Sequence, residues 1–180
     1  CSVESLTIEN TSFEYDPEGW TNEEVTVTAS STLATGEFRL QTSKNGEDWY
    51  ETASQVFSEN GPMYVRLWDG TNFGGAATAN VEKIDKTVPT VGTVTTTTNS
   101  LTFTASDTAG TNENASGVAY YIVSTSSTKP SVDSTSWVEY KGSTTVNNLT
   151  QGNKYYIYVT SPKGRPYPRY YTSCNYYNYS

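Results

Sequence analysis

Residues 25–30 have the sequence Val25-Thr-Val-Thr-Ala-Ser30, and residues 101–106 have the related sequence Leu101-Thr-Phe-Thr-Ala-Ser106. In both stretches apolar and polar side chains alternate. This is the pattern of a β-strand with one buried face, because successive side chains of a strand point to opposite sides. The second stretch begins 76 residues after the first. The sequence therefore predicts a strand at each place and indicates that one β-structured unit is repeated.

The same alternation recurs along the chain, at residues 37–42, 63–68 and 155–159. The segment Lys44-Asn-Gly-Glu47 contains an Asn-Gly pair, which is typical of a tight two-residue hairpin turn. The 30 Thr and 15 Tyr favour strands, whereas good helix formers are scarce. No stretch shows the sustained 3.6-residue periodicity of a helix. We therefore expect an all-β fold with essentially no helix.

Further matches define the repeat. Trp49 and Trp137 end corresponding segments 88 residues apart, and Gly61 and Gly152 begin corresponding strands 91 residues apart. The growing offset indicates loop insertions in the second copy, at 108–116 and around 128–135. A period of roughly 80–90 residues suits an immunoglobulin-like (Ig-like) sandwich of about seven short strands. Because Pro89 cannot continue a strand ladder, we expect two tandem Ig-like sandwiches, over 1–87 and 88–180, the second ending in a Tyr-rich tail at 166–180.

The motifs of the first unit carry a family resemblance. In chain order they are Tyr15-Asp-Pro-Glu-Gly-Trp20, Ser43-Lys-Asn-Gly-Glu-Asp-Trp49, Tyr64-Val-Arg-Leu-Trp-Asp69 and Ile84-Asp-Lys-Thr-Val-Pro89. This series resembles the bacterial Ig-like repeats of exported proteins from Gram-positive bacteria and their phages. The second unit, with Ser116-Gly-Val118 and Asn148-Leu-Thr-Gln-Gly152, is similar to the Ig-like or fibronectin III-like neighbours of such repeats. The resemblance covers residues 12–162 and implies an extracellular, cell-surface location.

Charge is unevenly distributed between the two halves. Residues 1–89 carry 15 acidic and five basic side chains, a net charge of −10, whereas residues 90–180 carry four acidic and six basic ones, a net charge of +2. The acidic half argues against nucleic-acid binding. No apolar run approaches the roughly 20 residues that span a membrane. Since the chain starts at Cys1 without a signal peptide, we expect a processed or excised piece of an exported protein.

The sequence offers little catalytic chemistry. It contains no His, which excludes His-based catalytic triads and His metal sites. The acidic pairs Glu23-Glu24 and Glu47-Asp48 fall in predicted loops or strand edges, where water keeps carboxylates ionised, unlike a glycosidase pair. Asp107 and residues 112–114 offer oxygen ligands for Ca²⁺, but without the alternate-residue spacing of a known calcium loop. We expect no catalytic residue, no cofactor and no metal site, and thus no enzyme.

Aromatic side chains supply the candidate interaction surface. Trp49 and Trp137 occupy equivalent repeat positions, so we expect both to pack in the cores. Trp68 lies on the same face of its strand as Arg66, opposite the apolar Leu67, so we expect it to be exposed or at an edge. Tyr side chains in the tail offer a large amphipathic contact area, and a final edge strand is the alternative role of this segment. The candidate surface comprises Trp68, Tyr167, Tyr170, Tyr171, Tyr176, Tyr177 and Tyr179.

These observations favour a non-catalytic extracellular structural or adhesion module, such as a stalk, spacer or filament subunit of a bacterial surface protein. Its partners would be protein neighbours or a glycan. The alternatives are a carbohydrate- or cell-wall-binding module and a pilus or phage-fibre subunit that assembles head to tail. Two domains in line, each roughly 30–40 Å across, would place Cys1 far from Cys174. A disulfide needs Cα atoms about 4.4–6.8 Å apart, so we expect no bridge within one chain.

Overall fold

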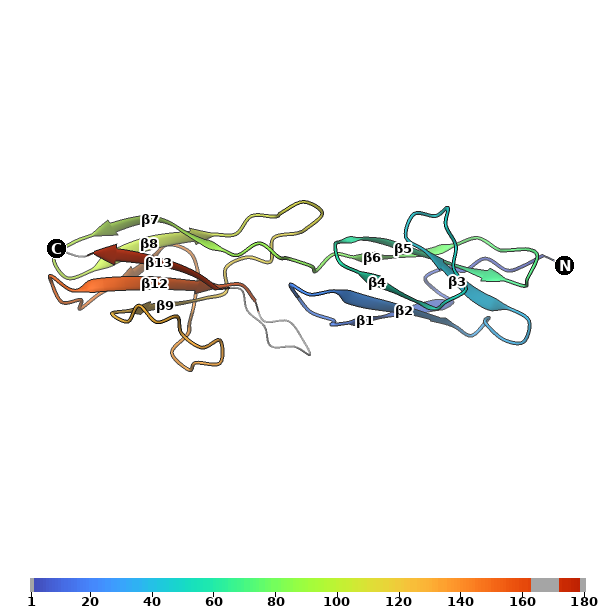
Figure 1. Ribbon diagram of the computed structural model, residues 1–180, viewed down its shortest axis with the longest axis horizontal. Helices are drawn as coiled ribbons and strands as arrows, with labels where there is room; N and C mark the ends of the chain where they lie inside the picture. Colours follow the sequence, from blue (N-terminus) through green and yellow to red (C-terminus); the bar gives the residue numbers. More distant parts are fainter. Residues whose placement is uncertain (1, 163–171, 179–180) are drawn as a thin grey trace. The chain divides into compact units, whose positions relative to one another are not determined.

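A computed structural model of the chain describes residues 2–162 and, for the backbone alone, residues 172–178. The chain divides into two compact units, unit 1 (Cys1–Ile84) and unit 2 (Asp85–Ser180). Every regular secondary-structure element of the described residues is a β-strand. This confirms the predicted all-β class of two Ig-like sandwiches. In Figure 1, each unit is built from two layers of strands.

Unit 1 is a sandwich of two three-stranded antiparallel sheets. Its strands are β1 (Thr11–Asp16), β2 (Val25–Ser31), β3 (Arg39–Ser43), β4 (Ser54–Phe57), β5 (Gly61–Trp68) and β6 (Ala77–Val81). One sheet has the order β1-β2-β4 and the other has the order β3-β5-β6. Both hydrogen-bonded neighbours of the central strand β5 run antiparallel to it.

The core of unit 1 follows directly from the alternating pattern of its central strands. Val25 and Val27 of β2 are buried, as are Val65 and Leu67 of β5, while the residues between them face outward. These apolar side chains from the two sheets form one cluster. Ile84 closes the unit: its N–H donates to Asn60 Oδ1 at 2.9 Å, and Asn60 Nδ2 donates to the Ile84 carbonyl at 3.0 Å.

The turn after β3 is longer than the Asn-Gly pair predicts. Thr42 pairs with Tyr50, so seven residues join the two sides instead of two. Gly46 has a positive φ of 76°, but Asn45 does not, and the predicted two-residue turn needs both. Asn45 Oδ1 instead accepts the N–H groups of Glu47 and Asp48, each at 2.9 Å. This side-chain bonding to the following backbone outweighs the tight turn.

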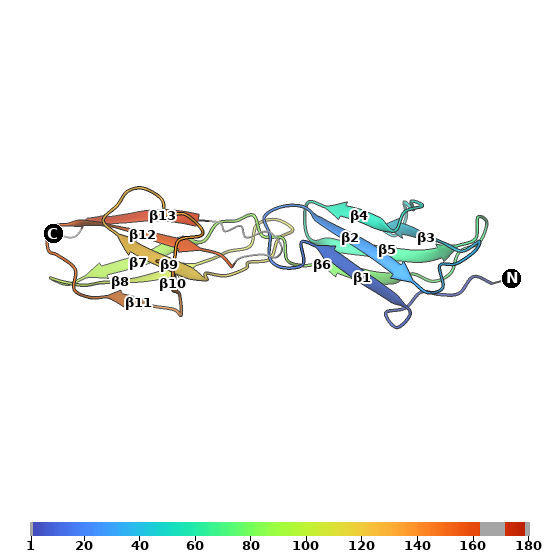
Figure 2. The same ribbon diagram turned by 90° about the horizontal axis from the view of Figure 1, so that it is seen from below.

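Unit 2 is a sandwich of three and four strands. Its strands are β7 (Thr90–Thr96), β8 (Leu101–Ser106), β9 (Tyr120–Ser124), β10 (Val138–Glu139), β11 (Thr144–Val146), β12 (Lys154–Thr160) and β13 (Thr172–Asn178). One sheet has the order β11-β8-β7, and the other has the order β10-β9-β12-β13. Figure 2 shows β11 beside β8, with which it pairs. The segment 172–178 of the Tyr-rich tail therefore adds an edge strand to the second sheet.

The core of unit 2 is centred on Phe103, which is fully buried and packs edge-on against Tyr121 with ring centroids 5.3 Å apart. Ile157 and Val159 of β12 complete the same cluster. Tyr155 lies at the start of β12, and its hydroxyl accepts the N–H of Thr150, which precedes the strand, at 2.9 Å. Such a bond from a tyrosine at the start of this strand to the backbone just upstream is the tyrosine corner of Ig-like domains.

Hydroxyl side chains line the outer faces of both units. Three hydroxyl pairs lie within hydrogen-bond distance across neighbouring strands: Ser12 and Ser30 at 2.7 Å, Thr28 and Ser54 at 2.8 Å, and Thr102 and Thr145 at 2.8 Å. Cross-strand pairs of this kind stabilise antiparallel sheets. The high Thr and Ser content thus has a structural role on these faces.

Candidate functional site

The outer face of the sheet β3-β5-β6 carries guanidinium groups stacked on aromatic rings. The guanidinium carbon of Arg66 lies 4.0 Å from the ring centroid of Trp49 and 3.8 Å from that of Phe73. Arg66 Nε also donates to Gln41 Oε1 at 2.9 Å. Burial lowers the pKa of Arg66, but a guanidinium group remains protonated in proteins. Arg66 therefore provides a fixed positive charge against two rings.

A second stack lies on the same face, two cross-strand pairs further along β3 and β5. Arg39 of β3 pairs with Trp68 of β5, and its guanidinium carbon lies 4.7 Å from the Trp68 ring centroid. Arg39 also forms an ion pair with Glu51 at 2.9 Å. Trp68 is partly buried and points away from the core, opposite to Leu67. The five side chains Trp49, Arg66, Phe73, Arg39 and Trp68 are named the aromatic ladder below.

The prediction that Trp49 and Trp137 pack in the cores is wrong, because both indoles are only partly buried. Each indole N–H is bonded to the loop that precedes it: Trp49 Nε1 donates to the Gly46 carbonyl at 3.1 Å, and Trp137 Nε1 donates to the Ser131 carbonyl at 2.9 Å. The internal repeat correctly indicates that Trp49 and Trp137 occupy similar positions after a loop. Equivalent positions in a repeat need not be buried, however. The polar residues directly before Trp49 were the available signal for an indole outside the core.

The tail tyrosines are mostly beyond the described part of the chain. Tyr176 and Tyr177 belong to β13, where their backbones pair with Tyr156 and Tyr155, and their side chains are not described. The remaining members of the predicted tail surface, Tyr167, Tyr170, Tyr171 and Tyr179, lie outside the described residues. The same holds for Cys1 and for the side chain of Cys174, and therefore for the expected absence of a disulfide between them.

Two carboxyl groups meet at the start of unit 2. Asp85 is 1% exposed and accepts the Ser116 N–H at 2.7 Å, while Asp107 Oδ2 accepts the Gly117 N–H at 2.8 Å. Burial raises the pKa of Asp107, and the neighbouring Asp85 charge adds to this rise, although the Gly117 bond acts against it. Within the described ranges, no group of three or more His, Cys, Asp or Glu side chains is placed to hold a metal ion.

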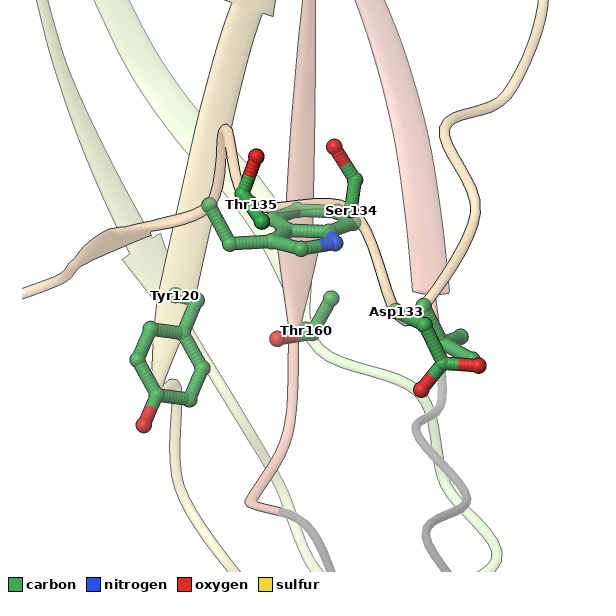
Figure 3. Close-up of a pocket in the computed structure, with 7 residues that line it drawn as sticks. Tyr120, Asp133, Ser134, Thr135 and Thr160 are labelled. Atoms are coloured by element: carbon green, nitrogen blue, oxygen red, sulfur yellow. The ribbon is translucent and has the colours of Figure 1, made fainter.

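Unit 2 also has a cavity of about 300 Å³. It is lined by Tyr120, Val132, Asp133, Ser134, Thr135, Trp137 and Thr160. Figure 3 shows Thr160 between Tyr120 and Asp133, with Ser134 and Thr135 on one side of them. Sequence reasoning missed this site because its walls come from β9, the loop before β10 and the end of β12. The inserted loop around 128–135 was its only sign in the sequence.

No protein-family model matches the chain. No curated protein matches it either. Among solved structures, the chain is similar to the FN1-FN3 domains of chicken CNTN1, with 16% identity, a TM-score of 0.38, and coverage of 97% of this chain and 68% of that one. It is also similar to a two-domain fibronectin type III segment of chicken tenascin, with 14% identity, a TM-score of 0.36, and coverage of 92% and 98%. Likenesses this weak carry no argument about what the chain binds.

Over the described residues, the chain contains no apolar helix of membrane-spanning length.

Proposed function

We propose that the chain is a non-catalytic structural or adhesion module of an exported bacterial surface protein, with units 1 and 2 as its two domains. The motif resemblance to Ig-like repeats of Gram-positive and phage proteins supports the extracellular location. The separate apolar cluster of each unit supports the role of a module in a longer surface structure, because each unit buries a core of its own.

The aromatic ladder is the single observation that carries the adhesion role. Phe73 is 59% exposed, and Tyr50, which follows Trp49 in the sequence, is 60% exposed, although both are large, mostly apolar side chains. Aromatic and Arg side chains are the groups most enriched at protein contact sites. Because Arg66 holds Trp49 and Phe73 in fixed positions, a partner would not have to order them on binding, which favours affinity. The partner is a protein neighbour or a glycan, and not nucleic acid, since unit 1 is strongly acidic.

The proposal is tested with beads that carry the full chain. Retention under flow is measured on Gram-positive cell-wall fragments and on a surface coated with the same chain. The variant Trp68→Ala/Phe73→Ala removes the outer rings of the ladder, and Ile8→Ala/Val56→Ala removes exposed apolar groups elsewhere on unit 1 as the matched control. We expect retention on at least one surface that falls to background only in the ladder variant. Equal retention of the unmodified chain, the ladder variant and the control variant contradicts the adhesion role. Release of soluble fragments from the cell wall contradicts a non-catalytic role.

Head-to-tail assembly into a filament is a second candidate, favoured by the charge asymmetry. Residues 1–89 carry −10 and residues 90–180 carry +2, with five of the latter's six basic residues after Glu139. A contact between the basic end of one copy and the acidic half of the next is not self-complementary, so it would propagate unless its rotation closes a ring. Opposite charges would steer this encounter.

A further inference from the structure

Unit 1 has four edge strands, because each of its two three-stranded sheets has an outer strand on either side. Unpaired N–H and C=O groups of an edge strand can bond a strand of another chain, so proteins usually cover or block them. At β4, Thr52 Oγ1 accepts the Ser54 N–H and donates to the Ser54 C=O, each at 3.2 Å. Lys44 Nζ donates to the Val56 C=O of the same strand. Side chains of the chain itself therefore block this edge.

The edges of β3 and β6 are blocked in a similar way. Thr42 of β3 exchanges two backbone hydrogen bonds with Tyr50, each of 2.9 Å. The backbone of Asn80 in β6 is hydrogen-bonded to the hydroxyl of Tyr15. Each of these three edge strands thus has edge groups that are already bonded within unit 1.

The remaining edge strand, β1, is open over its central part. The Ala29 N–H donates to the Ala53 C=O at 2.8 Å, on the β4 side of β2. Ala29 and its cross-strand partner Phe13 therefore form a non-hydrogen-bonded pair, in which the N–H and C=O of Phe13 point away from β2. The same holds for Tyr15, two residues further along. Within the described residues these four backbone groups have no hydrogen-bond partner, and Figure 2 shows β1 along the lower margin of unit 1.

The side chains along this open edge are acidic. Glu14 and Asp16 are exposed on the outer face of β1, which contains no Lys or Arg. Burial raises the pKa of Tyr15, the bond from Asn80 lowers it, and the charge of Glu82 raises it, which places a third carboxylate near the edge. Like charges on paired strands are destabilising and opposite charges are stabilising. The carboxylates therefore oppose pairing of two copies through β1 and favour a basic strand.

We propose that the β1 edge binds an extended basic segment of a protein neighbour, which adds a fourth strand to the sheet β1-β2-β4. This surface is separate from the aromatic ladder and goes beyond the adhesion role proposed for it. The backbone of the added strand bonds the N–H and C=O groups of Phe13 and Tyr15. Lys or Arg side chains at every second position lie opposite Glu14 and Asp16. In this mode of recognition main-chain bonds supply affinity, and alternate side chains supply specificity.

The test is a titration of the nitrogen-15-labelled full chain with the synthetic peptide acetyl-Thr-Lys-Val-Lys-Val-Thr-amide, followed at the amide signals of Phe13 and Tyr15. When the Lys side chains face Glu14 and Asp16, the N–H groups of both Val residues point towards β1 and those of both Lys residues point away. One peptide is therefore N-methylated at both Val residues, and its matched control is N-methylated at both Lys residues. A fourth peptide has Glu in place of both Lys residues.

Two variants of the chain test the charge requirement. Glu14→Lys/Asp16→Lys reverses the charge of the edge. Glu37→Lys/Glu47→Lys makes the same change in net charge at exposed positions elsewhere on unit 1 and is the matched control.

We expect the Lys peptide to shift the Phe13 and Tyr15 signals saturably and to slow hydrogen exchange of both amides. The peptide methylated at Lys should do the same, whereas the peptide methylated at Val should not bind. Glu14→Lys/Asp16→Lys should weaken binding of the Lys peptide by about tenfold or more, because two favourable pairs become repulsive. The same variant should bind the Glu peptide, and Glu37→Lys/Glu47→Lys should bind the Lys peptide as the unmodified chain does.

The proposal is overturned if the Lys peptide does not bind, or if it shifts signals outside β1 and its neighbours alone. It is also overturned if methylation at Val leaves the affinity unchanged, since binding would then be electrostatic without strand addition. Protection of the Phe13 and Tyr15 amides that grows with chain concentration in the absence of peptide would identify a second copy as the occupant, against the proposal.

Discussion

Replacing Arg66 by Met tests whether the guanidinium group holds the aromatic ladder together. The substitution keeps a flexible side chain of similar length but removes the charge, the two ring contacts and the bond to Gln41. Two partly exposed cation–π contacts contribute about 1–2 kcal/mol, and the hydrogen bond contributes about 1 kcal/mol. Contacts of the Met sulfur with the rings return about 1 kcal/mol. We therefore expect a net loss of about 1–2 kcal/mol.

Thermal unfolding of the full chain measures this loss, with the transition of unit 1 followed by tryptophan fluorescence because Trp20, Trp49 and Trp68 belong to that unit. In a domain of this size, 1 kcal/mol lowers the melting temperature by about 4–8 °C, so Arg66→Met should lower it by about 4–16 °C. Arg39→Met is the matched control. It loses one ring contact at 4.7 Å and an ion pair whose side chains are 48% and 46% exposed, so we expect less than about 1 kcal/mol.

A double-mutant cycle that combines Arg66→Met with Phe73→Leu isolates one contact of the ladder. A coupling energy of about 0.5–1 kcal/mol is expected for a cation–π pair at a partly exposed site. The account of the ladder is refuted if Arg66→Met unfolds at the wild-type temperature. It is also refuted if Arg39→Met costs as much as Arg66→Met, because the two-ring contact would then have no special weight.

Three further outcomes are expected. Asp107→Asn should stabilise unit 2 at pH 7. The pKa of Asp107 is raised in the folded state, so the folded state binds the proton more tightly than the unfolded state does, and stability is lost as the pH rises through that pKa. Asn carries no charge and avoids this loss. The gain should vanish in melting curves recorded below the ordinary Asp pKa of about 3.9, and an equal gain at both pH values would argue against this reasoning. Tyr155→Phe removes the bond to the Thr150 N–H and should cost about 0.5–1.5 kcal/mol in urea unfolding of unit 2, whereas an unchanged midpoint would mean that the corner bond is irrelevant to stability. If copies associate head to tail, sedimentation at low salt should show assembly that weakens at physiological salt, and a concentration-independent monomer at low salt would rule the filament out.

The fold was predictable from the sequence because strand alternation is a property of the backbone. In β2 and β5, side chains at every second position reach the core whatever the rest of the chain does. Burial of a single large ring is different, since it depends on which face of a sheet the neighbouring loop covers. Trp49 and Trp137 are held outside by bonds to Gly46 and Ser131, within loops whose course the alternation does not determine.

The cavity was beyond sequence reasoning for a related reason. Tyr120 and Thr160 are 40 positions apart and meet only through the pairing of β9 with β12. The polar sequence around 128–135 predicts an inserted loop, but it does not predict that this loop lines one cavity together with Thr160. The ladder had a clearer sign, since Arg66 and Trp68 alternate with the apolar residues of their strand and must share its outer face.

Single-molecule stretching of the full chain tests the central claim, that two separately folded sandwiches act as structural modules joined along one chain. Under reducing conditions, each unit should unfold in its own event. The extended length of a chain is about 3.3–3.6 Å per residue, so unit 1, residues 1–84, should release at most about 300 Å and unit 2, residues 85–180, at most about 345 Å, less the folded span of each. Two separate events of these sizes are the predicted result. One event that releases the sum of both lengths, or a smooth extension without events, would contradict the account.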